Sequence, residues 1–205
     1  MMDSRNKKTG PAITALLLGL SCLCGLVSSA GAVEARLYFA AGVFNFRQTE
    51  FRQLYGPMPA LGFYVDLFSR SNLGLATGVH YFMASGQALT LEGEPAVYQV
   101  KFYRWTFPLL LKYRLATGSF QLAAGAGIAL SIYDESWSGV ELSYHGQKIH
   151  FRAELAADLR LLSRLYLRAG VNWDSIPTGV SSMLLGGRRV NLAGLSLQAG
   201  VGTRI

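Results

Sequence analysis

The sequence alternates between large apolar residues and polar or small ones, and this period of two constrains its fold more than any other feature. In Tyr103–Leu115, every odd-numbered residue is large and apolar, whereas most even-numbered residues are polar. The same alternation recurs in Phe120–Tyr133, Ile149–Leu161, Leu165–Asp174 and Leu195–Ile205. Side chains two positions apart share one face of a β-strand. Each segment is therefore predicted to be a strand with one apolar face.

The first half of the chain carries the same signal less regularly. Leu61–Phe68 and Leu73–Met83 alternate, whereas Arg36–Arg47 is apolar on both phases in places and leaves its facing ambiguous. These segments bring the predicted number of strands to eight. No helical period stands out after the first 33 residues.

The connections between these segments alternate in length. Three are short, namely Ser69–Asn72, Ala116–Ser119 and Leu162–Arg164. Four are longer and polar or glycine-containing, namely Gln48–Met58, Ser85–Ala96, Asp134–Gln147 and Ser175–Arg188. Tight periplasmic turns and long outer loops are typical of outer-membrane barrels. The predicted fold is an all-β, eight-stranded antiparallel up-and-down transmembrane β-barrel.

The N-terminal segment has the pattern of a secretory signal peptide. Arg5, Lys7 and Lys8 precede the apolar run Ala12–Val27, and an A-x-A site follows at residues 30–32. This run is short for a membrane anchor, which needs about 20 residues. We expect residues 1–32 to be cleaved and residues 33–205 to form the barrel. Both cysteines lie in the first segment, so the barrel is expected to contain no disulfide.

Composition helps to decide which face points outward. Only 15% of the residues are charged, against about 25% in an average soluble domain. A secreted lipocalin would place its apolar face inside. Here the less apolar face is rich in glycine and alanine, which suits a narrow interior, and aromatic residues lie near strand ends, as lipid interfaces require. The apolar face is therefore predicted to contact lipid.

The inward face would then carry most of the strand charges. The predicted lumen residues are Arg104, Lys112, Arg114, Arg152, Glu154, Asp158, Arg160, Arg168 and Arg204, together with Asp66. An eight-stranded barrel has an interior just wide enough for side chains to fill, and isolated buried charges are costly. We expect a structural salt-bridge network centred on Glu154 and Asp158, with an ion pathway or ligand site as the alternative.

One hairpin resembles a known family. Phe107-Pro108-Leu109-Leu110-Leu111-Lys112-Tyr113-Arg114 is similar to the I-P-L-L-L-K-Y strand of the small outer-membrane β-barrel family of Bacteroidetes, which includes PorT-like proteins. The next strand, Phe120–Gly127, ends in Ala-Gly-Ala-Gly and also resembles that family. The resemblance implies an outer-membrane barrel over Arg36–Ile205. The chain departs from many such barrels in ending on Ile205 rather than on an aromatic residue.

The residues for catalysis or metal binding are not arranged in a recognisable motif. Of the three histidines, only His145 and His150 are close in sequence, and no cysteine accompanies them. The His-x-Ser pattern of lipid A deacylases is absent after His150. The net charge of +7 is not gathered in a basic block, so nucleic acid is not an expected partner. We expect no catalytic residues, metal or cofactor.

The long outer loops are the better functional candidates, because loops often carry binding residues. Trp137, Tyr144 and His145 fall in one predicted loop and are candidates for contact with a partner or ligand. Packing of the aromatic residues onto the barrel rim is the alternative. The leading hypothesis is a non-enzymatic outer-membrane protein with a structural or interaction role and a closed lumen. A small pore or transporter, a lipid-modifying enzyme and a secreted lipocalin-like barrel are the alternatives. Expected partners are outer-membrane lipid, the barrel assembly machinery and a protein that binds the loops.

Overall fold

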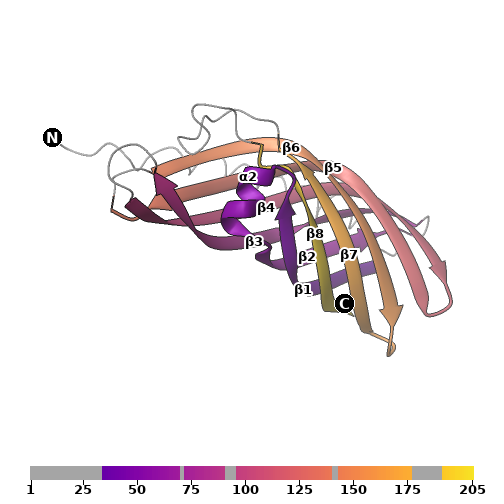
Figure 1. The fold of residues 1–205 in the computed structure, drawn as a ribbon. Coiled ribbons are helices and arrows are strands. Elements are labelled where there is room, and N and C mark those ends of the chain that lie inside the picture. The colour runs from indigo at the N-terminus through magenta and orange to yellow at the C-terminus, as the bar shows by residue number, and fades with distance from the viewer. Residues whose placement is uncertain (1–33, 70–71, 91–95, 140–142, 177–190) are drawn as a thin grey trace.

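Each predicted strand segment overlaps one of eight observed strands, which close into one antiparallel barrel in the order β1 to β8 (Figure 1). The computed structural model describes residues 34–69, 72–90, 96–139, 143–176 and 191–205. The strands are β1 (Glu34–Phe46), β2 (Met58–Phe68), β3 (Leu73–Thr90), β4 (Ala96–Thr117), β5 (Phe120–Trp137), β6 (Ser143–Arg160), β7 (Leu165–Ser175) and β8 (Gly194–Arg204). The predicted signal peptide, residues 1–32, lies outside the described residues.

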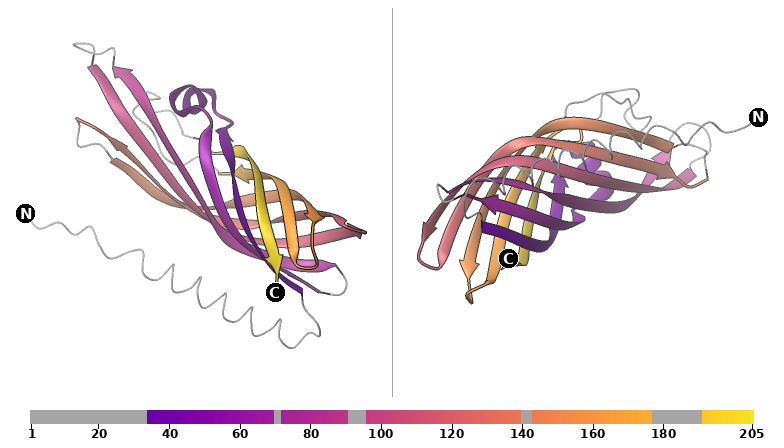
Figure 2. Two further views of the ribbon diagram at one scale, coloured as in Figure 1. Left: turned by 90° about the horizontal axis from the view of Figure 1, so that it is seen from below. Right: turned by 180° about the vertical axis from the view of Figure 1, so that it is seen from behind.

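Each strand pairs with its sequence neighbours, and β1 closes the barrel against β8. The β1–β8 register runs from Arg36 opposite Arg204 to Phe46 opposite Gly194. The beginning of β1, the end of β8 and the three short connections therefore share one rim, which we call the turn rim. The opposite end, reached by the four longer connections, is the loop rim (Figures 1 and 2). In the described part of the chain, no helix has the length and apolar character needed to cross a bilayer.

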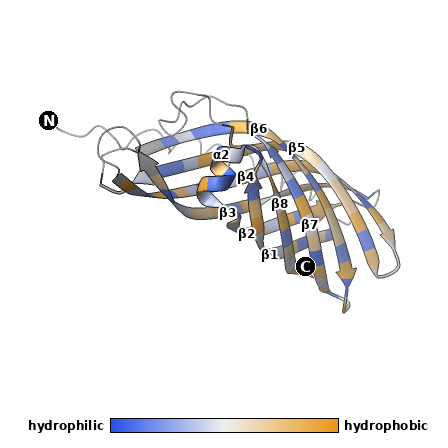
Figure 3. Cartoon of the chain, viewed as in Figure 1, coloured by the Kyte–Doolittle hydropathy of each residue, from blue (hydrophilic) through white to orange (hydrophobic). Residues whose placement is uncertain are grey.

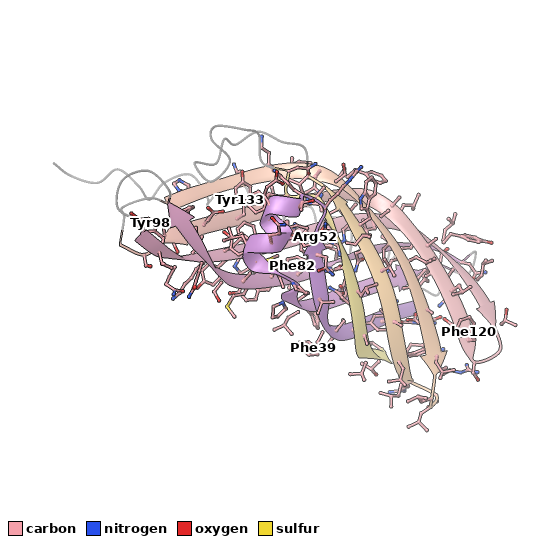
Figure 4. All side chains as sticks on the ribbon, in the orientation of Figure 1. Phe39, Arg52, Phe82, Tyr98, Phe120 and Tyr133 are labelled. Atoms are coloured by element: carbon pink, nitrogen blue, oxygen red, sulfur yellow. The ribbon has the colours of Figure 1, made fainter. Side chains whose placement is uncertain are left out.

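The apolar phase of the strands faces outward around the barrel. Hydrophobic and hydrophilic residues alternate along the strands in Figure 3. Phe39 and Phe120, both labelled in Figure 4, are 55% and 46% exposed. The inward residues of the same strands are buried, and many of them are charged. This facing is the reverse of a lipocalin, so the lipocalin-like alternative is wrong for this chain.

Strands β3 to β6 continue well beyond the others at the loop rim. They have 18 to 22 residues, whereas β1, β2, β7 and β8 have 11 to 13. Two predicted loops, Ser85–Ala96 and Asp134–Gln147, are thus largely strand, with pairs such as Gln87 opposite Gln99. These parts were predicted as loops because their outward residues are no longer apolar, whereas the hydrogen bonds between the strands continue. We call this projecting part, which consists of the end of β3, the start of β4, the end of β5 and the start of β6, the extension (Figure 2).

A short helix, α2 (Thr49–Tyr55), follows β1 at the loop rim, where the sequence predicted no helix. Its seven residues are too few to show a helical period. Phe51 and Tyr55 lie one turn apart on the same face and are both buried. Their rings pack against Phe46, and Tyr55 also packs against Phe102 of β4. These contacts fix α2 over the mouth of the barrel.

Close contact between α2 and β3 depends on Gly86. A Cβ atom at this position would lie 2.3 Å from the backbone oxygen of Leu54. We expect Gly86→Val to displace α2 and to increase tryptic cleavage after Arg52 roughly tenfold, because cleavage follows the population of the locally opened state. Limited proteolysis of the refolded protein measures this rate. Gln87→Val, at the neighbouring exposed position of the same strand, is the control, and equal cleavage of the two variants would contradict the packing role.

Candidate functional site

The lumen on the side of the turn rim is filled by a continuous set of ion pairs, here called the turn-side network. Asp66 of β2 accepts hydrogen bonds from Lys112 Nζ at 3.1 and 3.2 Å and from Arg168 Nη2 at 2.6 Å. Lys112 also donates to Glu154 Oε1 at 2.5 Å. Arg168 binds Asp158 through two parallel bonds, from Nε at 2.8 Å and from Nη2 at 3.0 Å. Four strands are thereby joined across the interior.

The same network continues towards the turn rim through Arg36. Its Nη1 lies 3.4 Å from Asp158 Oδ2, and its guanidinium also pairs with Glu34. Glu34 accepts a second bond from Arg114 Nη1 at 3.0 Å. Tyr38 donates to Asp158 Oδ2 at 2.9 Å. The network thus reaches from the middle of the barrel to its turn rim.

The charges of the turn-side network balance. Its cations are Arg36, Lys112, Arg114 and Arg168, and its carboxylates are Glu34, Asp66, Glu154 and Asp158. Aromatic faces cover the guanidinium groups, with Arg168 Cζ 3.4 Å from the centre of the Tyr38 ring. Burial is therefore compensated by opposite charge, hydrogen bonds and cation–π contacts.

Glycine supplies the room that these long side chains need. The stem of Lys112 lies over Gly125 of the neighbouring strand, where a Cβ atom would be 2.7 Å from Lys112 Cγ. A larger residue at this position would push the stem away from Asp66 and Glu154. The abundance of small residues on the inward phase thus has a direct structural role.

A second group of charges, the loop-side network, lies between the turn-side network and the loop rim. Asp174 of β7 accepts from Arg152 Nη1 at 2.8 Å and from Arg104 Nη2 at 2.9 Å. Arg152 Nη2 also lies 3.0 Å from His80 Nε2. Arg104 donates from Nη1 to the Leu192 carbonyl oxygen at 3.2 Å. One carboxylate therefore pairs with two buried guanidinium groups.

A serine and a histidine also meet in the lumen, a pair that the sequence analysis did not identify. Ser131 Oγ lies 2.9 Å from His150 Nε2 and 2.7 Å from Thr106 Oγ1. His150 Nδ1 lies 3.0 Å from the Phe151 carbonyl oxygen, so the imidazole is oriented by backbone and not by a carboxylate. Ser131 has no exposed surface. This arrangement links β4, β5 and β6 inside the lumen.

Most of the predicted lumen residues lie together as described above, but Arg160 and Arg204 do not. Both are exposed at the turn rim, because each lies at the end of its strand and beyond the closed interior. The partners of Asp158 are Arg168, Arg36 and Tyr38 instead. Arg36 is not among the predicted lumen residues, since its strand has no clear facing in the sequence. Asp174 is also not among them, although this residue lies on the predicted inward phase.

At the loop rim, the lumen ends in an apolar cluster that includes the buried face of α2. The buried residues that form it include Phe44, Phe46, Phe51, Tyr55, Met58, Phe82, Val100, Phe102 and Tyr133. The ring of Phe44 packs edge-on against Phe82 at 5.0 Å between centroids. From the turn rim to the loop rim, the lumen is thus filled first by ion pairs and then by packed aromatic rings, and both close the lumen.

The three predicted loop residues lie on strands. Trp137 ends β5, is half-buried and donates from Nε1 to Glu135 Oε1 at 2.8 Å. His145 is exposed on β6, opposite Asp134. Tyr144 also lies in β6, and its side chain is outside the described residues. Trp137 and His145 point to opposite faces of the extension, so they do not form one surface.

Glu135, which the sequence analysis did not single out, is a buried carboxylate of the extension. Burial, with the charge of Asp134 nearby, raises its pKa above the ordinary value for glutamate. Burial also raises the pKa of Tyr55, whose hydroxyl faces Glu135. In the described parts of the barrel and extension, no three His, Cys, Asp or Glu side chains are grouped to hold a metal ion.

Comparison with known proteins identifies the fold. The barrel is similar to a major outer membrane protein of Thermus thermophilus, with a TM-score of 0.60 and 12% identity over 85% of this chain and 100% of that chain. It is also similar to OprG of Pseudomonas aeruginosa, with a TM-score of 0.58 and 16% identity over 84% and 95%. For Neisserial surface protein A, the values are 0.54 and 14% over 84% and 97%.

No family model and no curated protein matches the sequence. The resemblance to the PorT-like family therefore stays a prediction. At these identities, the structural likeness establishes the architecture alone. The chain has the fold of the small eight-stranded outer-membrane β-barrels.

Proposed function

We propose that this protein is a non-enzymatic outer-membrane barrel with a closed lumen, which acts through the extension at its loop rim. The observation that carries the proposal is the filled interior. Lys112, Arg152 and Arg104 are 1%, 0% and 0% exposed and are tied to carboxylates on other strands. A barrel closed in this way presents a function only on its outer surface and at its rims.

An outer-membrane location is supported by the outward apolar band and by its height. The uninterrupted run of apolar outward residues on β4 extends from Tyr103 to Leu115, and aromatic rings lie near both ends of this run, including Trp105 and Tyr113. Twelve steps of about 3.4 Å, tilted by about 40°, rise about 31 Å. This height matches the hydrocarbon core of a bilayer, which is about 30 Å thick. The extension would then project from the outer surface.

The pore alternative is tested by electrical recording. We expect the refolded full-length barrel to give no reproducible conductance steps in a planar bilayer, because paired side chains occupy the lumen at two levels. A sixteen-stranded porin in the same bilayer is the positive control, and heat-modifiable gel mobility shows that the sample is folded. Discrete and repeated steps from the folded protein would overturn the closed-lumen proposal.

An enzymatic role has little support in the described residues. Ser131 and His150 are within hydrogen-bonding distance, but they lie inside the lumen and Ser131 is fully buried. A catalytic nucleophile needs an adjacent space in which the reacting atom can sit. Unchanged lipid A mass profiles in cells with and without the protein would support the non-enzymatic proposal.

A further inference from the structure

The turn rim carries exposed arginines without a counter-charge among the described residues. Arg160 ends β6, Arg204 ends β8, and Arg164 lies in the short connection between β6 and β7. All three are exposed. None of the ion pairs within the described part of the chain includes their guanidinium groups. We call these three residues the arginine cluster.

The arginine cluster lies on the ends of adjacent strands. The Arg204 amide donates to the Arg164 carbonyl oxygen at 2.9 Å, and Arg160 is the register partner of Tyr166, two residues after Arg164. Figure 1 shows the C-terminal end of β8 at this rim. Like charges at neighbouring positions of a sheet repel one another. An anion bound at this rim would offset that repulsion.

The carboxylates of this chain do not supply that anion within the described residues. The four carboxylates of the turn-side network are balanced by its own four cations, and Glu34, at the rim itself, is shared by Arg36 and Arg114. The exposed side-chain carboxylates of the described residues are Glu50 and Asp134, which lie on the loop side of the barrel. The positive charge of the arginine cluster thus remains available to a partner.

Exposed apolar side chains accompany the arginine cluster. Leu161 and Leu162 lie in the β6–β7 turn, between Arg160 and Arg164, and are 48% and 67% exposed. Ile205, at the end of the chain beyond β8, is 74% exposed. At the edge of a bilayer, apolar groups enter the hydrocarbon while the charged ends of arginine side chains stay at the level of the headgroups. This mixture of leucine and arginine fits a lipid surface better than it fits open water.

We propose that the arginine cluster binds the headgroups of anionic phospholipids in the leaflet at the turn rim. Guanidinium groups form paired hydrogen bonds with phosphate oxygens, and basic residues close to a membrane surface favour lipids of net negative charge. The leucines of the β6–β7 turn would contact the acyl chains of the same lipids. This inference rests on the proposed function, since it assigns a lipid class to the rim opposite the extension of an outer-membrane barrel.

The test measures which phospholipid lies beside the turn rim. The reporter is Leu165→Trp, next to Arg164 and 38% exposed in the parent chain, in the full-length protein that also carries Trp105→Phe, Trp137→Phe and Trp173→Phe. The protein is refolded in phosphatidylcholine vesicles that contain either brominated phosphatidylglycerol or brominated phosphatidylcholine as the quencher. At low ionic strength we expect an affinity for phosphatidylglycerol about fivefold above that for phosphatidylcholine. Heat-modifiable gel mobility shows that each sample is folded.

Two sets of substitutions separate the arginine cluster from net charge. The first set removes the arginine cluster and should bring the affinity ratio close to one, with Arg160→Gln, Arg164→Gln and Arg204→Gln. The matched control removes three exposed charges from the loop side and should leave the ratio within about twofold of the reporter protein, with Arg47→Gln, Arg52→Gln and Lys101→Gln. Phe120→Trp, 46% exposed on the neighbouring β5, is a second reporter if the first does not fold.

Equal quenching by the two lipids in the reporter protein would overturn the inference. An unchanged preference after removal of the arginine cluster would also overturn it, as would equal losses in the two sets. In each of these cases quenching still shows contact with lipid, so the proposed membrane position stands. Absence of quenching by either lipid in the folded protein would instead contradict the membrane position, and this inference with it. The two failures are therefore distinguishable.

Discussion

Replacing Asp174 with asparagine is expected to lower the free energy of unfolding by about 3–5 kcal/mol, the usual cost of breaking a buried ion pair by removing one partner. Asp174 is the carboxylate that holds both Arg104 and Arg152, at 2.9 and 2.8 Å. Asparagine keeps the shape of the side chain but leaves two buried guanidinium groups without a counter-charge. Urea unfolding of the protein refolded in phospholipid vesicles, followed by tryptophan fluorescence, measures the change.

Two further variants show whether charge is the cause. Asp134→Asn makes the same chemical change at an exposed site and should alter stability by less than about 0.5 kcal/mol. Adding Arg152→Gln to Asp174→Asn removes one of the unpaired cations and should recover part of the loss, giving a coupling energy between the two positions. A loss below about 1 kcal/mol in Asp174→Asn would show that the loop-side network contributes little to folding.

The architecture was predictable because lipid and lumen impose opposite chemistries on alternate residues. On β4, the outward Trp105 and Tyr113 and the inward Arg104 and Lys112 differ so strongly that the strand and its facing are readable from the sequence. Beyond the apolar band, the outward residues of a strand no longer need to be apolar. The extension around Gln87 keeps the hydrogen-bonded ladder without the apolar outer phase, so period-two patterns identify the strand only up to the edge of the apolar band.

The candidate sites were only partly predictable, because their partners are set by register across the barrel. The sequence shows that Lys112 and Asp158 face inward, but it does not show that Lys112 meets Asp66, 46 positions earlier in the chain. The position of Glu135 was missed for another reason. It was placed in a loop, where a carboxylate is ordinarily solvated, whereas the structure buries it beside Tyr55 of a helix too short to predict.

Introducing arginine at Ile128 is expected to destabilise the folded protein by about 2–4 kcal/mol in vesicles, the cost of an arginine facing lipid near the bilayer midplane. Ile128 is 56% exposed and lies opposite Leu109, halfway between the aromatic ends of the outward band on β4. Val97 is the matched control, since it is similarly branched, 59% exposed and located on the extension. Val97→Arg should cost only about 0–1 kcal/mol, because the extension is proposed to project from the bilayer into water. Equal effects of the two substitutions on urea unfolding would contradict the assignment of the apolar band to the membrane, since exposure is matched and only depth differs.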